Sequence, residues 1–140
     1  MRDEQVVIFK LGEEHYAVGM STVREIIVPP KIRSVPNAKE YVQGIINLRG
    51  KVIPILSLAK LLKLESVPSL PELQRQIVVL ENEETLLGIE VDGVNEVLNI
   101  AQYELEPTPK VIGQETFIDG ILNLGEGLIM MRNAPALFAT

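Results

Sequence analysis

The residues of this chain that could carry chemistry are nineteen aspartates and glutamates, one histidine and no cysteine. A pair of carboxylates serving as general acid and base is therefore the catalytic arrangement that the composition permits. The histidine, His15, follows two glutamates and is not part of a nucleophile-elbow sequence, so it does not indicate a Ser-His-Asp triad. The absence of cysteine excludes disulfides, thiolate zinc sites, iron–sulfur clusters and cysteine nucleophiles.

Motifs that bind phosphate or a cofactor are also missing from the sequence. Gly50-Lys51 is followed by valine and preceded by no glycine-rich loop, so it is not a P-loop, and no Gly-x-Gly-x-x-Gly occurs. The glutamates of residues 12–14 and 81–84 fit charged, exposed turns better than they fit a metal site. We expect no catalytic residues, no metal and no cofactor. A small hydrolase that uses two acids stays an alternative, although no motif supports it.

The charge of the chain disfavours nucleic acid as a partner. Its formal net charge is −6, its pI is about 4.8, and it has no cluster of lysine and arginine that would attract a phosphate backbone. With six tyrosines and phenylalanines in total and no tryptophan, it offers little for base stacking. Residues 6–9 form an apolar run too short to cross a bilayer, and the N-terminus has no signal core. We expect a cytoplasmic protein without direct membrane insertion.

The chain repeats itself, and the repeat shows which elements position these residues. Residues 44–53 (GIINLRGKVI) return as residues 120–129 (GILNLGEGLI), and residues 23–26 (VREI) return as residues 94–97 (VNEV). In each half, two apolar runs around a charged turn come before these segments and predict a hairpin, at 6–9 with 16–18 and at 77–80 with 86–89. A three-residue link that contains glycine, after residue 48, predicts another hairpin with a bulge.

Short strands rich in valine and isoleucine, without long helical periods between them, are typical of small barrels or sandwiches. Each half supplies about five such strands. Two short helices are predicted, over residues 38–43, ending at Gly44, and over residues 58–62, for which Ser57 is a suitable N-cap. We expect one domain over residues 1–140, with interleaved lobes, approximate repeat units at 5–65 and 76–138, and a linker at about 66–75 that contains two prolines.

The repeated segment also carries a resemblance to a known family. Residues 44–50 (GIINLRG), followed by residues 52–55 (VIPI), resemble the signature of the CheW family of bacterial chemotaxis coupling proteins. Similar segments stand at residues 12–16, 23–26, 88–94 and 120–122, so the resemblance runs in order along nearly the whole chain. It implies an all-β protein with a few short helices, built as two SH3-like five-stranded β-barrel lobes that share a hydrophobic core. It also implies that the protein is not an enzyme.

The partners and site residues that we expect follow from this resemblance. It implies a stand-alone adaptor that links the cytoplasmic tips of methyl-accepting chemoreceptors to the regulatory domain of the histidine kinase CheA. An adaptor of the same build that serves a different chemosensory pathway, such as surface motility, is the alternative. In similar proteins, partner coupling involves the positions that are here Arg49, Glu25, Val23, Ile26, Gly44, Val94 and Val97. The chain departs from the family at Ser57, where aspartate is frequent, and at residues 130–135.

The internal repeat gives an independent view of these positions. Gly125 occupies the position of Arg49 in the second copy, so the turn does not need arginine, which suits interfaces with carboxylates. Glu96 repeats Glu25, which leaves a shared structural role open for the two glutamates. The apolar residues at 23, 26, 94 and 97 fit either the core or a groove that faces a partner.

Overall fold

A computed structural model of the protein describes residues 5–11, 14–61, 75–99, 105–106, 118–123 and 128–132. Within these residues the chain is mostly β-strand, with a 3₁₀ turn, η1 (Met20–Thr22), and a single helical turn, α1 (Leu58–Leu61). The strands of the first half are β1 (Gln5–Leu11), β2 (Glu14–Gly19), β3 (Val23–Ile27), β4 (Val42–Leu48) and β5 (Lys51–Ser57). Those of the second half are β6 (Gln76–Asn82), β7 (Thr85–Val91), β8 (Gly93–Asn99), β9 (Leu105–Glu106), β10 (Ile118–Asn123) and β11 (Leu128–Arg132).

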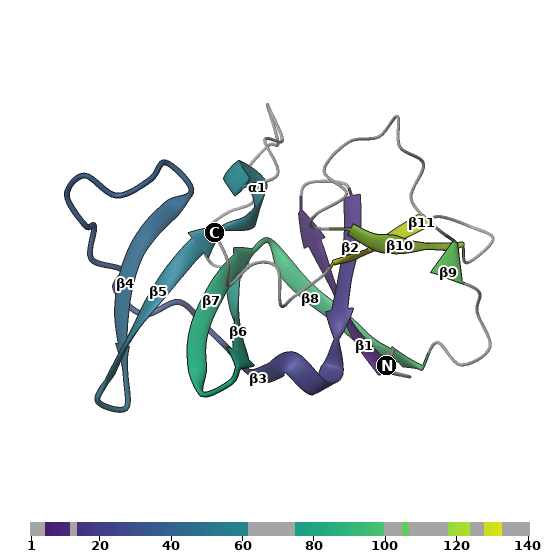
Figure 1. Ribbon diagram of the computed structural model, residues 1–140, viewed down its shortest axis with the longest axis horizontal. Helices are drawn as coiled ribbons and strands as arrows, with labels where there is room; N and C mark the ends of the chain where they lie inside the picture. Colours follow the sequence, from purple (N-terminus) through teal and green to yellow (C-terminus); the bar gives the residue numbers. More distant parts are fainter. Residues whose placement is uncertain are drawn as a thin grey trace.

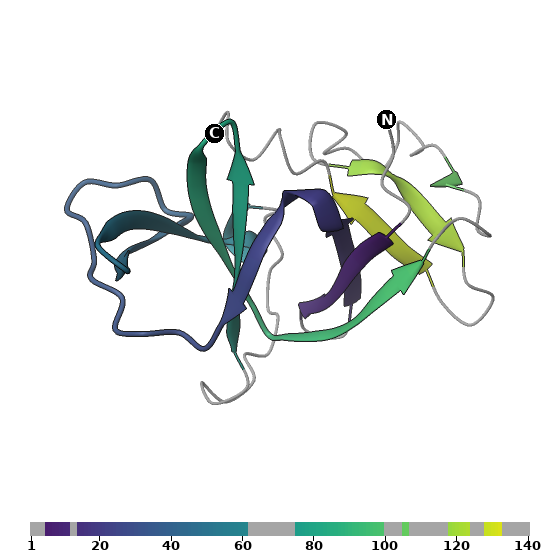
Figure 2. The same ribbon diagram turned by 90° about the horizontal axis from the view of Figure 1, so that it is seen from below.

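The strands form two sheets that lie side by side as two lobes (Figures 1 and 2). The sheet with the order β8-β1-β2-β11-β10-β9 is called the β1 lobe here, and the sheet with the order β3-β6-β7-β5-β4 is called the β6 lobe. Neighbouring strands are antiparallel except for β2 with β11 and β5 with β7, which are parallel. Each lobe therefore combines a hairpin from one half of the chain with the later strands of the other half.

The two lobes use the same strand pairing twice. β3 pairs with β6 so that Glu25 lies opposite Val79, and β8 pairs with β1 so that Glu96 lies opposite Ile8. In each pair the register shifts just before the glutamate, which marks a β-bulge. The short sequence echo between residues 23–26 and 94–97 thus corresponds to one bulged strand that the fold uses in both lobes.

The main hydrophobic cluster extends across both lobes and confirms the shared core. It joins side chains of β1 and β2 to side chains of β5, α1, β6 and β7, and the rings of Phe9 and Tyr16 stack in it with centroids 6.2 Å apart. β1 is buried along most of its length and does not alternate, because it lies between β8 and β2. Burial of each such side chain contributes about 1.5–3 kcal/mol. The cluster consists of Val7, Phe9, Leu11, Tyr16, Val18, Leu56, Leu58, Val78, Leu80, Leu87, Ile89 and Val91.

A long connection between β3 and β4 closes the outer end of the β6 lobe, where it runs as an open loop in Figure 2. Arg33 in this connection forms a two-way backbone bridge with Ile45 of β4 (N–H to O, 2.9 and 2.8 Å). The helix predicted over residues 38–43 is wrong, since these residues form a turn and the start of β4, with Val42 opposite Leu56. So short a helix is unstable alone, and strand pairing satisfies its backbone better.

Two other local predictions are confirmed, and several lie outside the described residues. Ser57 is the N-cap of α1, where its Oγ accepts a hydrogen bond from the backbone N–H of Lys60 at 3.3 Å. The hairpin predicted around residues 81–84 is present as β6 and β7. The turn at residues 12–13, residues 62–74 of the predicted linker and the C-terminal residues beyond Arg132 lie outside the described residues. No described helix is long and apolar enough to span a membrane.

Candidate partner-binding surface

Arg49 stands at the tip of the hairpin between β4 and β5. Leu48 and Lys51 form the last strand pair, so the link has two residues, Arg49 and Gly50, and the predicted three-residue link is wrong. Both residues have positive φ, 51° and 86°, as in the tight turns that suit the twist of hairpins. The side-chain oxygen of Asn47 accepts the backbone N–H of Gly50 at 2.9 Å and supports the turn.

The conformation of this turn is unfavourable for arginine. Left-handed backbone brings Cβ close to the following carbonyl, so glycine or asparagine is preferred there. The second copy of the repeat has glycine at this position, Gly125. The turn therefore does not explain the presence of Arg49, and its side chain must contribute something that the backbone does not need.

Arg49 and Glu25, two of the expected site residues, are brought together by the fold. Nη2 of Arg49 donates to Oε1 of Glu25 at 2.8 Å, which joins the tip of the β4–β5 hairpin to β3. The Arg49 side chain is 70% exposed, whereas that of Glu25 is 24% exposed. The hydrogen bond to Glu25, and then its negative charge, raise the pKa of Arg49 above its ordinary value. Arg49 is therefore positively charged at every physiological pH.

The apolar positions beside Glu25 have two different environments. Val23 is partly buried and packs against the shared core cluster, so part of its side chain belongs to the core. Ile26 is 37% exposed on the same strand. β3 thus presents one apolar side chain to the core and one to solvent around the Glu25 carboxylate.

The equivalent strand of the β1 lobe, β8, repeats this arrangement without the ion pair. Val94 is partly buried against the shared core, and Val97 is 48% exposed. Glu96 is exposed, and within the described residues it has no ion-pair partner. The backbone N–H of Val94 donates to the side-chain oxygen of Gln76 at 2.8 Å, which ties β8 to the start of β6 and so joins the two lobes.

The backbone around Gly44 explains why this position is glycine. Its φ is +151°, it lies at the register shift of β4, and an added Cβ would overlap the carbonyl oxygen of Arg33. Glycine is therefore required for the β3–β4 connection to dock on β4. Its expected part in partner binding stays a prediction.

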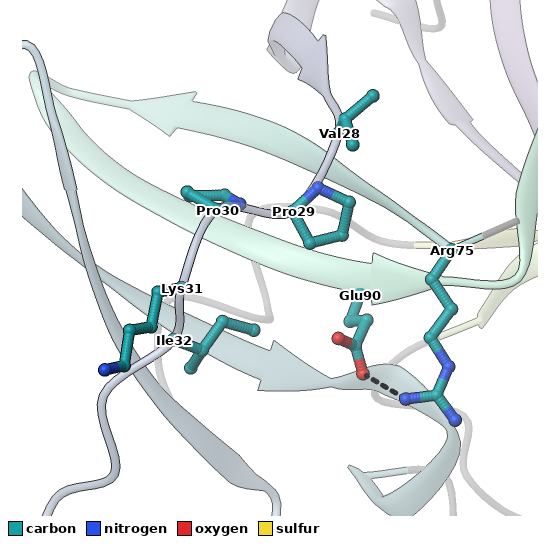
Figure 3. Close-up of a pocket in the computed structure, with 7 residues that line it drawn as sticks. All are labelled: Val28, Pro29, Pro30, Lys31, Ile32, Arg75 and Glu90. Atoms are coloured by element: carbon teal, nitrogen blue, oxygen red, sulfur yellow. Dashed lines mark ion pairs between the residues drawn. The ribbon is translucent and has the colours of Figure 1, made fainter. Parts of the chain in front are cut away.

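A pocket that the sequence did not indicate lies between the β3–β4 connection and the sheet of the β6 lobe (Figure 3). Its volume is about 450 Å³. Residues 28–32 have no periodic pattern, and Arg75 falls in the predicted linker, so only the paired prolines could have drawn attention to it. Its lining consists of Val28, Pro29, Pro30, Lys31, Ile32, Arg75 and Glu90.

Neither surface has the composition of a catalytic centre. Within the described part of the chain, no three histidine, aspartate or glutamate side chains are grouped so that they could hold a metal ion. The carboxylates at the two surfaces, Glu25 and Glu90, are each paired with an arginine. The geometry is that of charged and apolar surfaces that can contact another macromolecule.

Comparison with known proteins decides the family. Residues 5–140 match the family model described as "CheW-like domain". The chain belongs to the CheW-like domain family. A probable chemotaxis protein CheW of Rhizobium etli is 30% identical over 139 residues, which cover 98% of this chain and 88% of the relative. The chemotaxis protein CheW of Treponema pallidum is 34% identical over 141 residues, which cover 97% of this chain and 82% of the relative.

A solved structure of the same family supports the fold. The crystal structure of scaffolding protein TtCheW from Thermoanaerobacter tengcongensis superposes with a TM-score of 0.85 at 30% sequence identity, covering 95% of this chain and 86% of that one. The resemblance to the CheW family and the all-β fold with two SH3-like lobes are thereby confirmed. The family is one of chemotaxis scaffolding proteins and not of enzymes, so the hydrolase alternative is wrong.

Proposed function

We propose that this CheW-family protein is an adaptor that couples the cytoplasmic tips of methyl-accepting chemoreceptors to the regulatory domain of the histidine kinase CheA. The observation that carries the proposal is Arg49, which is exposed at the tip of a turn where glycine would be more favourable. A permanently charged, forked side chain in that position suits a carboxylate on a partner.

The ion pair with Glu25 prepares Arg49 for such a contact. The ion pair uses one carboxylate oxygen of Glu25 and one guanidinium nitrogen of Arg49. The guanidinium has five N–H donors, so most of them stay available on this exposed side chain. Holding the side chain in one orientation lowers the entropy that binding would cost. Glu25 is therefore assigned a positioning role for Arg49 in addition to any contact of its own.

Apolar area for binding comes from β3, which carries Glu25, and from the equivalent strand β8 of the other lobe. Ile26 on β3 and Val97 on β8 are 37% and 48% exposed, while Val23 and Val94 lie between core and surface. An apolar centre bordered by charged residues is the usual composition of a specific interface. We assign all seven expected positions to partner surfaces, Gly44 because its bulge shapes β4 next to the β3–β4 connection.

The interfaces of a reversible signalling adaptor are expected to be modest. An area of about 800 Å² per partner or less, at the weak end of the standard range, allows assembly and exchange. Two such contacts on one small protein are sufficient to join a receptor to a kinase, because linking them raises the effective concentration of each partner.

The proposal is tested by calorimetric titration of the chain with the CheA regulatory domain and, separately, with a soluble receptor tip. Arg49→Gly is the informative variant, because it removes the guanidinium and gives the turn the residue that it prefers. We expect wild type to bind both partners saturably and Arg49→Gly to lose at least one of them while its thermal unfolding is unchanged or improved.

Arg24→Gln is the control for the loss of an exposed arginine. Glutamine replaces Arg24 because glycine would weaken strand β3, in which Arg24 lies. Arg24 is 57% exposed and pairs with Glu81 at 3.0 Å, so it is another exposed, ion-paired arginine of the β6 lobe. We expect this variant to bind like wild type. Undiminished binding of both partners by Arg49→Gly would remove Arg49 from the interface, and absence of binding by wild type would overturn the adaptor role.

A further inference from the structure

The pocket of the β6 lobe has an apolar middle and a positive charge at each end. In Figure 3, Lys31 and Arg75 lie at opposite ends of the lining, with Pro30 and Ile32 between them, and Ile32 points towards the strand that carries Glu90. Prolines are rigid, so the apolar wall is largely preformed. Its volume of about 450 Å³ lies in the usual range for sites that bind side chains or small ligands.

Arg75 is held in this pocket with hydrogen-bonding capacity to spare. Its side chain is 27% exposed, and its contact with Glu90 is 3.7 Å long, which exceeds hydrogen-bonding distance. In the part of the chain that the structure describes, no hydrogen bond from the Arg75 guanidinium occurs. Because Arg75 is only partly buried, its spare N–H donors can bind acceptors that a partner supplies.

Glu90 does not satisfy this requirement. Its carboxylate is 13% exposed and already accepts a hydrogen bond from Nε2 of Gln43 at 3.1 Å. The side-chain oxygen of Gln43 in turn accepts a hydrogen bond from Nζ of Lys60 at 3.3 Å. Glu90 is thus held by β4 and α1, and it orients Arg75 without saturating it.

The lining of the pocket has two cations, Lys31 and Arg75, and one acid, Glu90, whereas acids outnumber cations in the whole protein. The chain has a net charge of −6, yet residues 28–39 contain three cations, Lys31, Arg33 and Lys39, and no acid. Within the described residues, Lys31 and Arg33 take part in no ion pair. A local positive surface on an acidic protein attracts acidic segments selectively and steers their approach.

We propose that this pocket docks a short acidic segment of a partner protein, in which aliphatic side chains are flanked on both sides by carboxylates. The aliphatic side chains occupy the space along Pro30 and Ile32, and the flanking carboxylates reach Arg75 at one end and Lys31 at the other. The inference rests on the proposed adaptor role, because it adds a docking point that is separate in sequence and in lining from Arg49 and Glu25.

The test is a titration of the full, ¹⁵N-labelled chain with the peptide acetyl-Glu-Glu-Leu-Val-Glu-Glu-amide, followed by amide chemical shifts. We expect saturable shifts of the amides of residue 28, residues 31–33, Arg75 and Glu90, with a dissociation constant of about 1 mM or lower. A peptide with serines in place of leucine and valine, and one with glutamines in place of the glutamates, should each bind at least about fivefold more weakly.

Two variants of the chain locate the contacts. Arg75→Gln and Lys31→Gln should each weaken peptide binding by about fivefold or more, whereas Arg24→Gln should leave it unchanged. Lys31 is exposed and unpaired within the described residues, so Lys31→Gln keeps the test valid even if loss of the Arg75–Glu90 pair disturbs folding. Shifts at Arg49 and Glu25 instead of the pocket, or equal binding by the glutamine peptide, would overturn the proposal.

The remaining outcomes separate this inference from the adaptor role. If the peptide causes no chemical-shift changes while the chain still binds the receptor tip and the kinase domain, the docking proposal is overturned and the adaptor role stands. If the chain binds the peptide but neither the receptor tip nor the kinase domain, the docking proposal stands and the adaptor role is overturned. Concentration-dependent dimerisation that Lys31→Gln abolishes would make a second copy of the chain the occupant and overturn the proposed partner.

Discussion

The two lobes have five strands in equivalent order, to which the β1 lobe adds β9 at its edge, and their sequences differ at the link of the second hairpin. In the β6 lobe, Arg49 stands at the β4–β5 tip and forms an ion pair with Glu25 of β3. In the β1 lobe, the matching sequence positions are Gly125 and Glu96, and Glu96 is exposed, with no ion-pair partner among the described residues. The bulged strand with its glutamate is therefore common to both lobes, whereas the arginine occurs in one of the two copies.

This difference teaches how a duplicated fold acquires a binding surface. Duplicated positions that keep the same residue type, such as Val23 with Val94, pack against the shared core in both copies. Positions that differ, such as Arg49 with Gly125, are free of that structural requirement. The contrast between copies thus identifies Arg49 as a residue that its turn does not require.

The largest expected effect tests whether the bulge of β4 is as necessary as its geometry indicates. Gly44→Ala places a Cβ against the carbonyl oxygen of Arg33 at a φ of +151°, so the β3–β4 connection must move away from β4. We expect a loss of about 3 kcal/mol of unfolding free energy and a fall in Tm of about 10 °C. Urea denaturation and calorimetric melting measure both.

Gly50→Ala is the matched control for Gly44→Ala. Gly50 also has positive φ, 86°, but an added Cβ there meets nothing within 4 Å. The backbone penalty alone should cost about 1 kcal/mol. Equal losses in the two variants would show that backbone conformation, and not contact with Arg33, determines the need for Gly44.

The next largest change in stability is expected at the parallel strand pairs, where the two lobes can be compared directly. Gly88 of β7 lies opposite Ile55 of β5, and Ala17 of β2 lies opposite Met131 of β11 in the equivalent pair. An added Cβ at Gly88 would approach side-chain carbons of Ile55 and Ile77 at 2.6 and 2.8 Å. Because these are side-chain ends that can move, we expect Gly88→Ala to cost about 1–2 kcal/mol in urea denaturation.

Ala17→Gly provides the reverse substitution in the other lobe. Ala17 is fully buried, and losing its methyl group in a strand should cost about 1–2 kcal/mol. A stabilising Gly88→Ala would show that the two strand pairs have the same spacing, and the packing difference between the lobes would then be withdrawn.

Much of the fold could be predicted because the repeat and the alternation of apolar and turn residues are local signals. The hairpins and the N-cap at Ser57 follow from such signals, whereas the two SH3-like lobes were expected from the family resemblance, and the pairing of β2 with β11 and of β5 with β7 joins distant parts of the chain. The helix expected before Gly44 failed because a few residues with helical propensity were overruled by contacts with β5, where Val42 lies opposite Leu56 and the carbonyl of Tyr41 accepts the N–H of Ser57. Propensity alone contains no information about such a partner.

The site was predictable to a similar extent. The family resemblance named both Arg49 and Glu25, but no spacing in the sequence could show that these two side chains meet, since the ion pair depends on the closure of β4 towards β3. The pocket was missed for the same reason, because Arg75 and the paired prolines approach one another only in the folded sheet. Charges brought together by tertiary structure leave no periodic signal.

A smaller effect sharpens the comparison between the turns of the β6 lobe. The β6–β7 hairpin ends in Glu83 and Glu84, both with positive φ of 50° and 69°, whereas the β4–β5 hairpin has Gly50 at its second turn position. Glu84→Gly should therefore stabilise the protein by about 0.5–1 kcal/mol in urea denaturation. Thr85→Gly, one residue later within β7, should destabilise it, and a destabilising Glu84→Gly would mean that the glutamate makes a contact that outweighs its backbone strain.

The last prediction concerns the two repeated glutamates and decides between a shared structural role and a role specific to the β6 lobe. Glu25→Gln and Glu96→Gln each remove one negative charge from a solvent-accessible position, so we expect the Tm of both variants to stay close to that of wild type. Glu25→Gln should nevertheless weaken binding of the receptor tip or the kinase domain, because Arg49 loses the carboxylate that orients it, while Glu96→Gln should bind normally.

Salt and pH provide the readout that a merely structural role would not change. The hydrogen bond to Glu25, and then its negative charge, hold the pKa of Arg49 above its ordinary value, so its positive charge is fully present at every physiological pH and would be lost only in strong alkali. Binding that depends on Arg49 should accordingly be constant between about pH 6 and 9 and should weaken as salt increases. In Glu25→Gln the salt dependence should persist at lower affinity, whereas equal binding and melting of both glutamine variants would return Glu25 to the structural role that it shares with Glu96.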